Sequence, residues 1–281
     1  MTVSSALQPD QQPACWDEHV EVYEAVFEPL TNAFARAALD RLNLHPGETL
    51  IDIGAGCGGA ALMAATAYGA DVLAIDASRE MVGRIITRAK QHKCARLRAE
   101  TMDGMAMSLG DAQFDAAISV FGVILFPDAV GGMRETARVL KPGGRVAIVT
   151  WTDTERYELA TRLIDAIAAV RGPQPPPSAL PAQLRFRDAG AFRRLLSAGG
   201  LVVQSITRVE EQWRLPSARW LAERIAFAPG LSALLGGLGS DRNAVMTAFV
   251  AALERDQGRG EVNLCAIAHI GTATKPPITN E

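Results

Sequence analysis

Apolar residues follow two different spacings along the middle of the chain. Apolar runs of strand length occur at residues 49–53, 71–75, 95–100, 114–120 and 145–151. Between them lie longer segments at 59–68, 78–92 and 129–140, which we interpret as helices. Strands that alternate with helices are typical of a parallel sheet covered by helices on both faces. The pattern therefore predicts an α/β fold with a Rossmann-like, doubly wound sheet.

The N-terminal part has a different pattern. Residues 1–14 are polar and contain Pro9 and Pro13, so we expect a loose tail. Residues 16–42 carry apolar side chains at helical spacing, and Pro29 is expected to split them into two helices. We interpret residues 1–45 as a tail followed by a helical lid over the site.

The C-terminal part mixes helices and strands. A helix is predicted at 154–170, a Pro-rich connector at 172–177, a helix at 188–197 and strands at 201–209 and 262–271. We therefore divide the chain into a core at 46–152, a segment at 153–274 that completes the sheet, and a tail at 275–281. Within the second segment, residues 211–257 are expected to form a mostly helical substrate cap.

Composition and charge narrow the function classes. The 281 residues contain 28 Lys and Arg against 31 Asp and Glu, a formal charge of −3, so a nucleic-acid partner is not expected. No apolar stretch is long enough to span a membrane, and no secretory signal is visible. Four scattered cysteines without a Cys/His cluster indicate a reduced, cytoplasmic protein with no metal site.

A glycine-rich turn follows the first predicted strand. Residues 50–59 read LIDIGAGCGG and lead directly into a predicted helix. Glycines let a ligand approach the backbone, and the amino end of a helix attracts anionic groups. Gly54, Gly56 and Gly59 satisfy the dinucleotide fingerprint, with Asp76 at about the spacing of its ribose-binding acid. A nucleotide-type cofactor is therefore expected, and NAD(P) is one candidate.

Two further motifs favour a different cofactor. The fourth predicted strand begins FDAAIS at residue 114, and LKPGG at 140–144 precedes the fifth. With the glycine turn and the acids after the strands, these motifs resemble the class I S-adenosylmethionine (SAM)-dependent methyltransferases. The small-molecule branch typified by ubiquinone/menaquinone-biosynthesis C-methyltransferases is especially similar. The resemblance is strong over about residues 46–152 and continues to about residue 274. It implies a seven-stranded sheet whose last strand, 262–271, runs antiparallel beside the fifth.

The resemblance also implies roles for individual residues. Asp52 and the glycines hold the methionine part of SAM, Asp76 accepts hydrogen bonds from both ribose hydroxyls, and Asp103 accepts one from the adenine amino group. The segment after Asp103 lacks the proline that the family usually has there. The full set of expected cofactor residues is Asp52, Gly54, Gly56, Gly58, Asp76, Ala77, Met81, Met102, Asp103, Gly104 and Ser119.

Substrate contacts are expected outside the sheet. The cap contains aromatic and aliphatic side chains that suggest an apolar pocket, namely Trp213, Trp220, Phe227, Leu231, Leu234 and Leu235. An alternative is that the cap buries its apolar residues in its own core, and Phe121 and Phe126 are equally consistent with core packing. The expected substrate contacts are Trp16, Phe121, Phe126, Trp213 and Trp220. If the reaction needs a general base, His19 and Tyr23 are the candidates.

The sequence thus predicts a SAM-dependent methyltransferase that acts on a small, mostly apolar metabolite and releases S-adenosylhomocysteine. The sequence does not decide whether oxygen, nitrogen, carbon or sulfur is methylated, and oxygen, nitrogen and carbon are the acceptor atoms expected. The protein is expected to be a monomer or homodimer. Two alternatives are a SAM-binding protein with a role other than methyl transfer, and an NAD(P)-dependent oxidoreductase.

Overall fold

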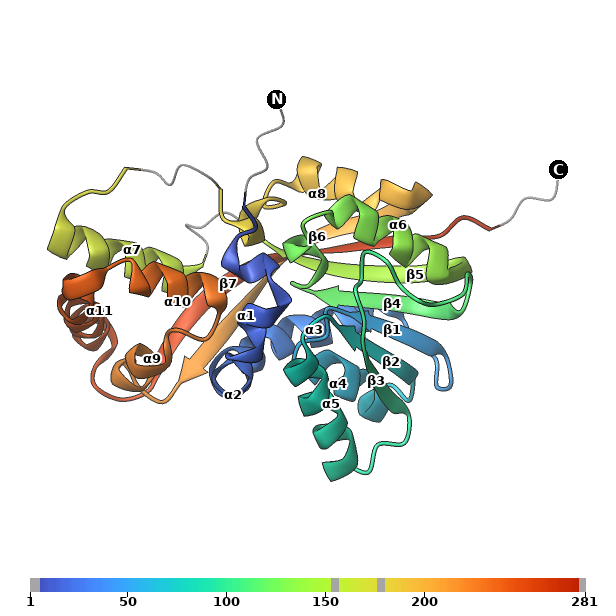
Figure 1. Ribbon diagram of the computed structural model, residues 1–281, viewed down its shortest axis with the longest axis horizontal. Coiled ribbons are helices and arrows are strands. Elements are labelled where there is room, and N and C mark those ends of the chain that lie inside the picture. The colour runs from blue at the N-terminus through green and yellow to red at the C-terminus, as the bar shows by residue number, and fades with distance from the viewer. Residues whose placement is uncertain (1–5, 153–156, 176–179, 278–281) are drawn as a thin grey trace.

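The computed structural model describes residues 6–152, 157–175 and 180–277. Its centre is a single seven-stranded sheet in the order β3-β2-β1-β4-β5-β7-β6 (Figure 1). The strands are β1 (Thr49–Ile53), β2 (Asp71–Asp76), β3 (Leu97–Thr101), β4 (Phe114–Val120), β5 (Leu140–Trp151), β6 (Val202–Leu215) and β7 (Val262–Thr274). β7 is antiparallel to both of its neighbours, whereas the other pairings are parallel. The predicted fold class and the antiparallel last strand are confirmed.

Successive residues of each strand point to opposite faces of the sheet, and helices cover both faces. Leu50 packs in one buried cluster with α3 (Glu28–Leu42), α4 (Gly59–Ala67) and α5 (Arg79–Gln91). Its neighbour Ile51 packs in a second cluster with α6 (Ala129–Val139) and α8 (Ala189–Leu196). Near-continuous apolar strands are expected when both faces of a sheet are buried.

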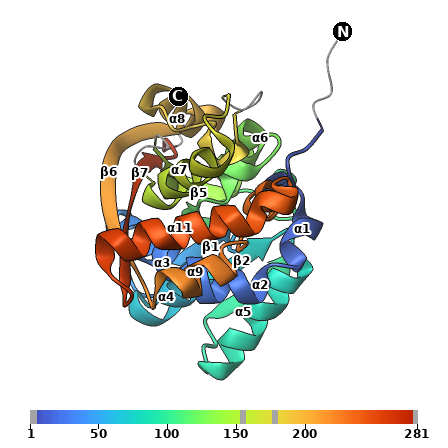
Figure 2. The ribbon, with the colours of Figure 1, turned by 90° about the vertical axis from the view of Figure 1, so that its left-hand side faces the viewer.

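The remaining helices gather at one end of the sheet (Figure 2). These are α7 (Glu158–Arg171), α9 (Ala218–Arg224), α10 (Pro229–Gly236) and α11 (Arg242–Gln257). They stand where β6 and β7 project beyond the parallel strands (Figure 1). β6 continues to Leu215, so the first residues of the predicted cap belong to the sheet. The start of the predicted helix at 154 and the end of the Pro-rich connector lie outside the described residues.

The N-terminal segment is ordered and helical from residue 9, contrary to the expected loose tail. It forms a 3-10 turn η1 (Pro9–Gln11), helices α1 (Pro13–Asp17) and α2 (Val20–Val22), and a π-helical segment (Tyr23–Phe27). Pro9 and Pro13 each occupy the first position of a helical turn, where a missing N–H costs nothing. The break expected at Pro29 is absent, because the π-helical segment continues directly into α3 with Phe27 and Glu28 both in the right-handed helical conformation. Pro29 is tolerated as the second residue of α3, where its missing N–H costs little.

A buried ion pair ties this segment to the glycine turn. Arg88 Nη1 donates to both carboxylate oxygens of Glu28 at 2.6 and 2.7 Å and to the carbonyl of Cys57 at 2.8 Å. The side chains of Arg88 and Glu28 are 15% and 7% exposed. One guanidinium therefore joins α3, α5 and the loop after β1.

We expect Arg88→Met to destabilise the protein by about 3 kcal/mol, because it leaves the Glu28 carboxylate buried without its cation. Urea denaturation at pH 7.5 measures the loss. The matched control is Arg96→Met, since Arg96 pairs with Asp71 where both side chains are about half exposed and such pairs contribute at most about 1 kcal/mol. Equal losses in the two variants would contradict this account of the Glu28 pair.

Candidate functional site

A cavity of about 1000 Å³ opens at the carboxyl ends of β1, β2 and β4. The strand order reverses between β1 and β4, and ligands of open α/β sheets bind at such switch points. One wall comes from the loops after these strands. The other walls come from η1, α1, the π-helical segment, α7, the 180–187 segment and α10.

Two backbone segments approach each other closely at this opening. A Cβ on Gly54 would lie 2.9 Å from Cα of Gly122, and one on Gly122 would lie 2.7 Å from the carbonyl oxygen of Ile53. Ser119 Oγ holds the segments together, donating to Ile53 O at 2.6 Å and accepting from Val123 N at 2.9 Å. Glycine is therefore required at 54 and 122 by space, and at 54 also by its φ of +68°.

Most of the predicted cofactor residues line one part of the cavity. They are Gly54, Gly56, Asp76, Ala77, Met81, Met102, Asp103 and Gly104. Asp52, Gly58 and Ser119 are not among the lining residues. Ser119 is buried where its hydroxyl joins the two backbone segments. Gly58 is the residue before α4 and has a left-handed conformation.

Asp76 ends β2 with its carboxylate directed at the glycine turn. Its Oδ2 accepts from Gly56 N at 2.8 Å and its Oδ1 from Ser78 N at 2.9 Å. Burial raises the pKa of Asp76 to about 6, although these backbone N–H groups act in the opposite direction. Each carboxylate oxygen has a second lone pair that stays available for a ligand hydroxyl.

Asp52 lies beneath the glycine turn and is 1% exposed. Its Oδ2 has no hydrogen-bond partner among the described residues. Burial, with the negative charge of Asp76 second, raises the pKa of Asp52 to about 7. A buried carboxylate oxygen without a partner is costly, so the site favours a ligand that brings positive charge or hydrogen-bond donors.

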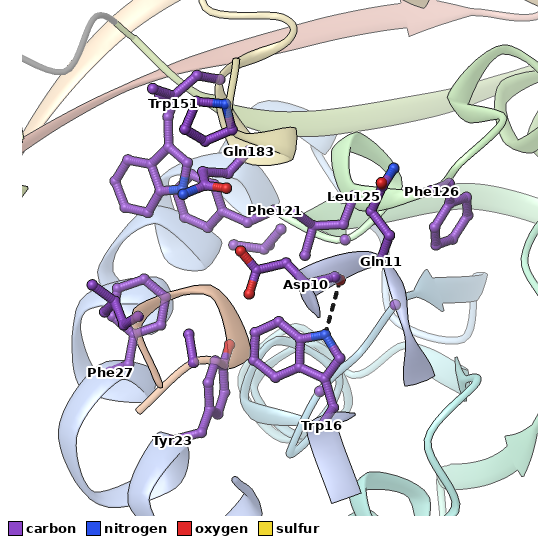
Figure 3. Close-up of a pocket in the computed structure, with 18 of the residues that line it drawn as sticks. Asp10, Gln11, Trp16, Tyr23, Phe27, Phe121, Leu125, Phe126, Trp151 and Gln183 are labelled. Atoms are coloured by element: carbon purple, nitrogen blue, oxygen red, sulfur yellow. Dashed lines mark hydrogen bonds between the residues drawn. The ribbon is translucent and has the colours of Figure 1, made fainter. Parts of the chain in front are cut away.

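Aromatic rings line the part of the cavity away from the glycine turn (Figure 3). Phe121 stacks on Trp151 with centroids 3.9 Å apart, and Trp151 stacks on Tyr157 at 4.8 Å. Phe27 stacks on Phe227 at 4.6 Å. Phe121 has a φ of +60°, a strained conformation for a bulky residue that is common at functional sites.

The predicted substrate contacts divide into two groups. Trp16, Phe121 and Phe126 line the cavity, as do Phe227, Leu231 and Leu234 of the predicted cap. The positions of Trp213 and Trp220 do not support the prediction. Trp213 is 2% exposed and donates to Val26 O, packing behind Phe27 and Phe227. Trp220 lies under the guanidinium of Arg224.

Neither predicted base is well suited to that role. His19 is buried outside the cavity lining, and its Nδ1 donates to Cys15 O at 2.7 Å. Tyr23 lines the cavity, but burial holds its pKa far above the usual range. Its phenol therefore stays protonated and can donate a hydrogen bond to a ligand.

Sequence reasoning missed several lining residues. Asp10, Gln11, Trp151, Tyr157 and Gln183 all face the cavity. Prolines at 9 and 13 were a helix-start signal that could have marked the Asp10 segment as ordered. For the aromatic residues no signal distinguishes lining a cavity from filling a core.

Comparison with known proteins agrees with this geometry. A family described as "Methyltransferase domain" matches residues 50–144, the stretch from β1 to the start of β5. This stretch is a methyltransferase domain. The resemblance predicted from the glycine turn and the LKPGG motif is confirmed.

The names of several curated relatives of the methyltransferase domain refer to quinones and natural products. Demethylmenaquinone methyltransferase of Corynebacterium kroppenstedtii is 37% identical over 113 residues, 40% of this chain and 46% of that protein. Nocamycin O-methyltransferase of Saccharothrix syringae is 28% identical over 217 residues, 73% of this chain and 78% of that protein. The chain spans about half the length of several other relatives, including an uncharacterized Mycobacterium tuberculosis protein (31% identical, 54% of this chain and 56% of that one).

Among solved structures, the [4+2]-cyclase SpnF has the same fold. The TM-score is 0.63 at 19% sequence identity, with 98% of each chain covered. The likeness in fold therefore extends well beyond the methyltransferase domain, but it does not by itself fix the reaction.

Two findings concern predicted absences. No helix in the described part of the chain has the length and apolar character to cross a bilayer. Within residues 6–152, 157–175 and 180–277, no three His, Cys, Asp or Glu side chains are grouped so that they could hold a metal ion.

We expect Asp52→Asn to stabilise the ligand-free protein at pH 8 but not at pH 4. The pKa of Asp52 is raised on folding, so its contribution to stability is present below pH 4 and is lost as pH rises through about 7. Asparagine does not titrate, so the difference in free energy of unfolding between the variant and the wild type grows from pH 4 to pH 8 and reaches at most a few kcal/mol. Denaturation at both pH values measures it, with exposed Asp71→Asn as control. A destabilised variant at pH 8 would show that the ionised carboxylate is needed by the fold.

Proposed function

We propose that the protein transfers a methyl group from SAM to a small, mostly apolar acceptor. The observation that carries this proposal is the single cavity that joins the Asp76–glycine turn to an aromatic chamber. A cofactor held at the strand ends and an acceptor held among the rings would meet within one enclosed space. Methyl transfer needs alignment of the two reactants and exclusion of water.

The residues at the strand ends fit SAM. Asp76 has lone pairs for the two ribose hydroxyls, and the orphan oxygen of Asp52, which is buried behind the lining, suits the α-ammonium group through water. Ala77, Met81 and Met102 offer apolar contacts for adenine, with Asp103 for its amino group. The bare backbone of Gly54 and Gly56 leaves room for the methionine part. When bound, the sulfonium supplies the activated methyl group.

The acceptor side is mostly apolar, and Asp10 and Gln183 are among the few polar side chains that line it. Four side chains at the cavity, Leu7, Ile164, Leu180 and Leu234, are large, apolar and exposed. Half of the exposed large apolar side chains among the described residues thus gather at this opening. An apolar rim favours entry of an apolar metabolite.

Two alternatives remain to be separated by experiment. A SAM-binding protein without methyl transfer is compatible with a fold that a [4+2]-cyclase also has. An NAD(P)-dependent oxidoreductase would use the same glycine fingerprint, but it leaves the aromatic chamber and the LKPGG motif unexplained. Location in the cytoplasm, absence of nucleic-acid binding and a monomeric or dimeric state stay predictions.

Thermal shift with SAM, S-adenosylhomocysteine, NAD and NADP tests the cofactor. A ligand at a hundred times its dissociation constant adds about 2.7 kcal/mol of stability, so we expect a clear shift with the first two only. Transfer of labelled methyl from SAM to any apolar acceptor then separates the enzyme from the non-transferring alternative. A shift with NAD or NADP alone would overturn the proposal.

We expect Asp76→Asn to weaken S-adenosylhomocysteine binding about 10- to 100-fold, because a charged acceptor of hydroxyl hydrogen bonds is lost. Wild-type affinity should also fall below about pH 6, where the carboxyl becomes protonated. Calorimetry at pH 7.5 and pH 5 measures both effects. Asp71→Asn, at the far end of the same strand, is the control and should leave affinity unchanged. Undiminished binding by Asp76→Asn would remove Asp76 from the ribose site.

A further inference from the structure

Three carboxylates of the described residues line the cavity, and one of them has no assigned role. Asp76 and Asp103 follow the strands that are proposed to hold the nucleoside. The third is Asp10 in η1, which is 9% exposed. Figure 3 shows its carboxylate directed away from the backbone, among Trp16, Tyr23, Phe27 and Phe121.

One oxygen of Asp10 is used by the fold and the other is free. Oδ1 accepts from Gly230 N, at the start of α10, at 2.7 Å. Among the described residues Oδ2 has no hydrogen-bond partner. The Gly230 bond fixes the side chain, and thereby fixes the direction in which Oδ2 presents its lone pairs. A positioned carboxylate oxygen in an apolar chamber is a strong hydrogen-bond acceptor.

A short chain of contacts links Asp10 to the glycine turn. Trp16 Nε1 donates to the Asp10 carbonyl at 3.0 Å. The Trp16 ring packs edge-on against Tyr23 with centroids 5.9 Å apart, and a Cβ on Gly56 would lie 3.5 Å from the Tyr23 hydroxyl. Asp10 is therefore linked to the proposed cofactor region through the packed rings of Trp16 and Tyr23.

A second polar group in the chamber also lacks a partner. The Gln183 amide makes no hydrogen bond to the described residues, and its Oε1 is buried. Gln183 lies in η5 (Ala182–Leu184), which is tied to the N-terminal segment because Ala182 N donates to Gln8 Oε1 at 2.8 Å. Buried polar groups in native proteins nearly always have partners. The buried oxygen of Gln183 and the accessible Oδ2 of Asp10 together indicate a ligand that brings O–H or N–H groups.

We propose that Asp10 binds and deprotonates a hydroxyl group of the acceptor, so that the protein is an O-methyltransferase for a hydroxylated, otherwise apolar aromatic molecule. This inference rests on the proposed function. It replaces His19 and Tyr23 with a carboxylate whose free oxygen faces the cavity. Gln183 then recognises a second polar group of the same molecule.

The proton and electron balance is simple. The acceptor oxygen forms a bond to the methyl carbon as the bond from that carbon to sulfur breaks, and the sulfur keeps the bonding electron pair. The hydroxyl proton passes to Asp10 Oδ2 and is then released to water. The products are the methyl ether, S-adenosylhomocysteine and one proton.

Several charged or titratable groups surround Asp10. Burial raises the pKa of this carboxyl, while Gly230 N–H and the nearby His19 act against the rise. Tyr23 faces the cavity from the π-helical segment, η5 contributes the neutral Gln183, and Arg187 lies farther along the same wall. A carboxylate with a raised pKa is a better proton acceptor at neutral pH.

The test uses a matched pair of ligands and a matched pair of variants. The probes are 7-hydroxycoumarin and 7-methoxycoumarin, which differ in the O–H donor. The variants are Asp10→Asn and Asp188→Asn. Asparagine at 10 keeps an oxygen for Gly230 N but removes the charge. Asp188 likewise caps a helix, accepting from Ala191 N at 2.9 Å, and is not among the cavity residues. Fluorescence titration with S-adenosylhomocysteine present measures binding without turnover.

We expect wild type and Asp188→Asn to prefer the hydroxy probe at least 10-fold below the pKa of its own hydroxyl. Their affinity should fall steeply when pH is raised until the probe is a phenolate, because two negative charges then meet. In Asp10→Asn the preference for the hydroxy probe over the methoxy probe should drop several-fold. The affinity of this variant for the hydroxy probe should also fall much less when pH is raised. Methyl transfer to the hydroxy probe should fall about 100-fold or more in Asp10→Asn.

Each result bears on a separate claim. A wild-type protein that binds both probes equally, or neither, overturns the inference, and this comparison does not depend on whether Asp10→Asn folds. An unchanged pH dependence in a folded Asp10→Asn also overturns it. Failure to bind S-adenosylhomocysteine, in contrast, overturns the proposed function itself.

Discussion

The site depends on how closely two backbone segments meet at the ends of β1 and β4. No side chain fits between Gly54 and Gly122, and the Ser119 hydroxyl bonds to both sides of the junction. The connection that follows β1 leads to β2, and the connection that follows β4 leads to β5 on the opposite side of the strand order. A cavity therefore opens between the two connections. Beside this junction, Phe121 has a left-handed conformation and its ring stacks on Trp151. The cofactor loop and the aromatic chamber therefore meet at one close approach of the backbone.

The other walls are held by contacts between distant segments. Asp10 bonds to Gly230, and Gln8 bonds to Leu180 and Ala182. Trp213 supports the stacked pair of Phe27 and Phe227 from behind while bonding to Val26. The N-terminal segment, the cap and the sheet thus share one boundary around the cavity. Ligand binding in the cavity should therefore order all three together.

Negative charge is concentrated in this cavity at a cost to stability. Burial raises the pKa of Asp10, Asp52 and Asp76 in the same direction. Such perturbed groups gather at functional sites more often than elsewhere. Here the Oδ2 of Asp52 is buried without a partner among the described residues, whereas the Oδ2 of Asp10 is open to the cavity. A ligand that brings an ammonium group and hydroxyl groups would supply donors for both.

The sequence by itself determined the strands and helices of the parallel part of the sheet, the glycine turn and the acid at the end of β2. These features depend on the local spacing of apolar residues and on short motifs, so their pattern can be read along the chain. The antiparallel pairing of β5 with β7 places Arg145 beside Thr274, and it was expected only from the family resemblance. Only the tertiary structure decided which aromatic residues face the cavity. Trp213 and Phe227 look alike in sequence, yet one supports the wall and the other forms it. Asp10 could not be identified from the sequence either, because its side chain is positioned by a hydrogen bond from Gly230, 220 positions away. No local sequence pattern encodes a contact across that distance.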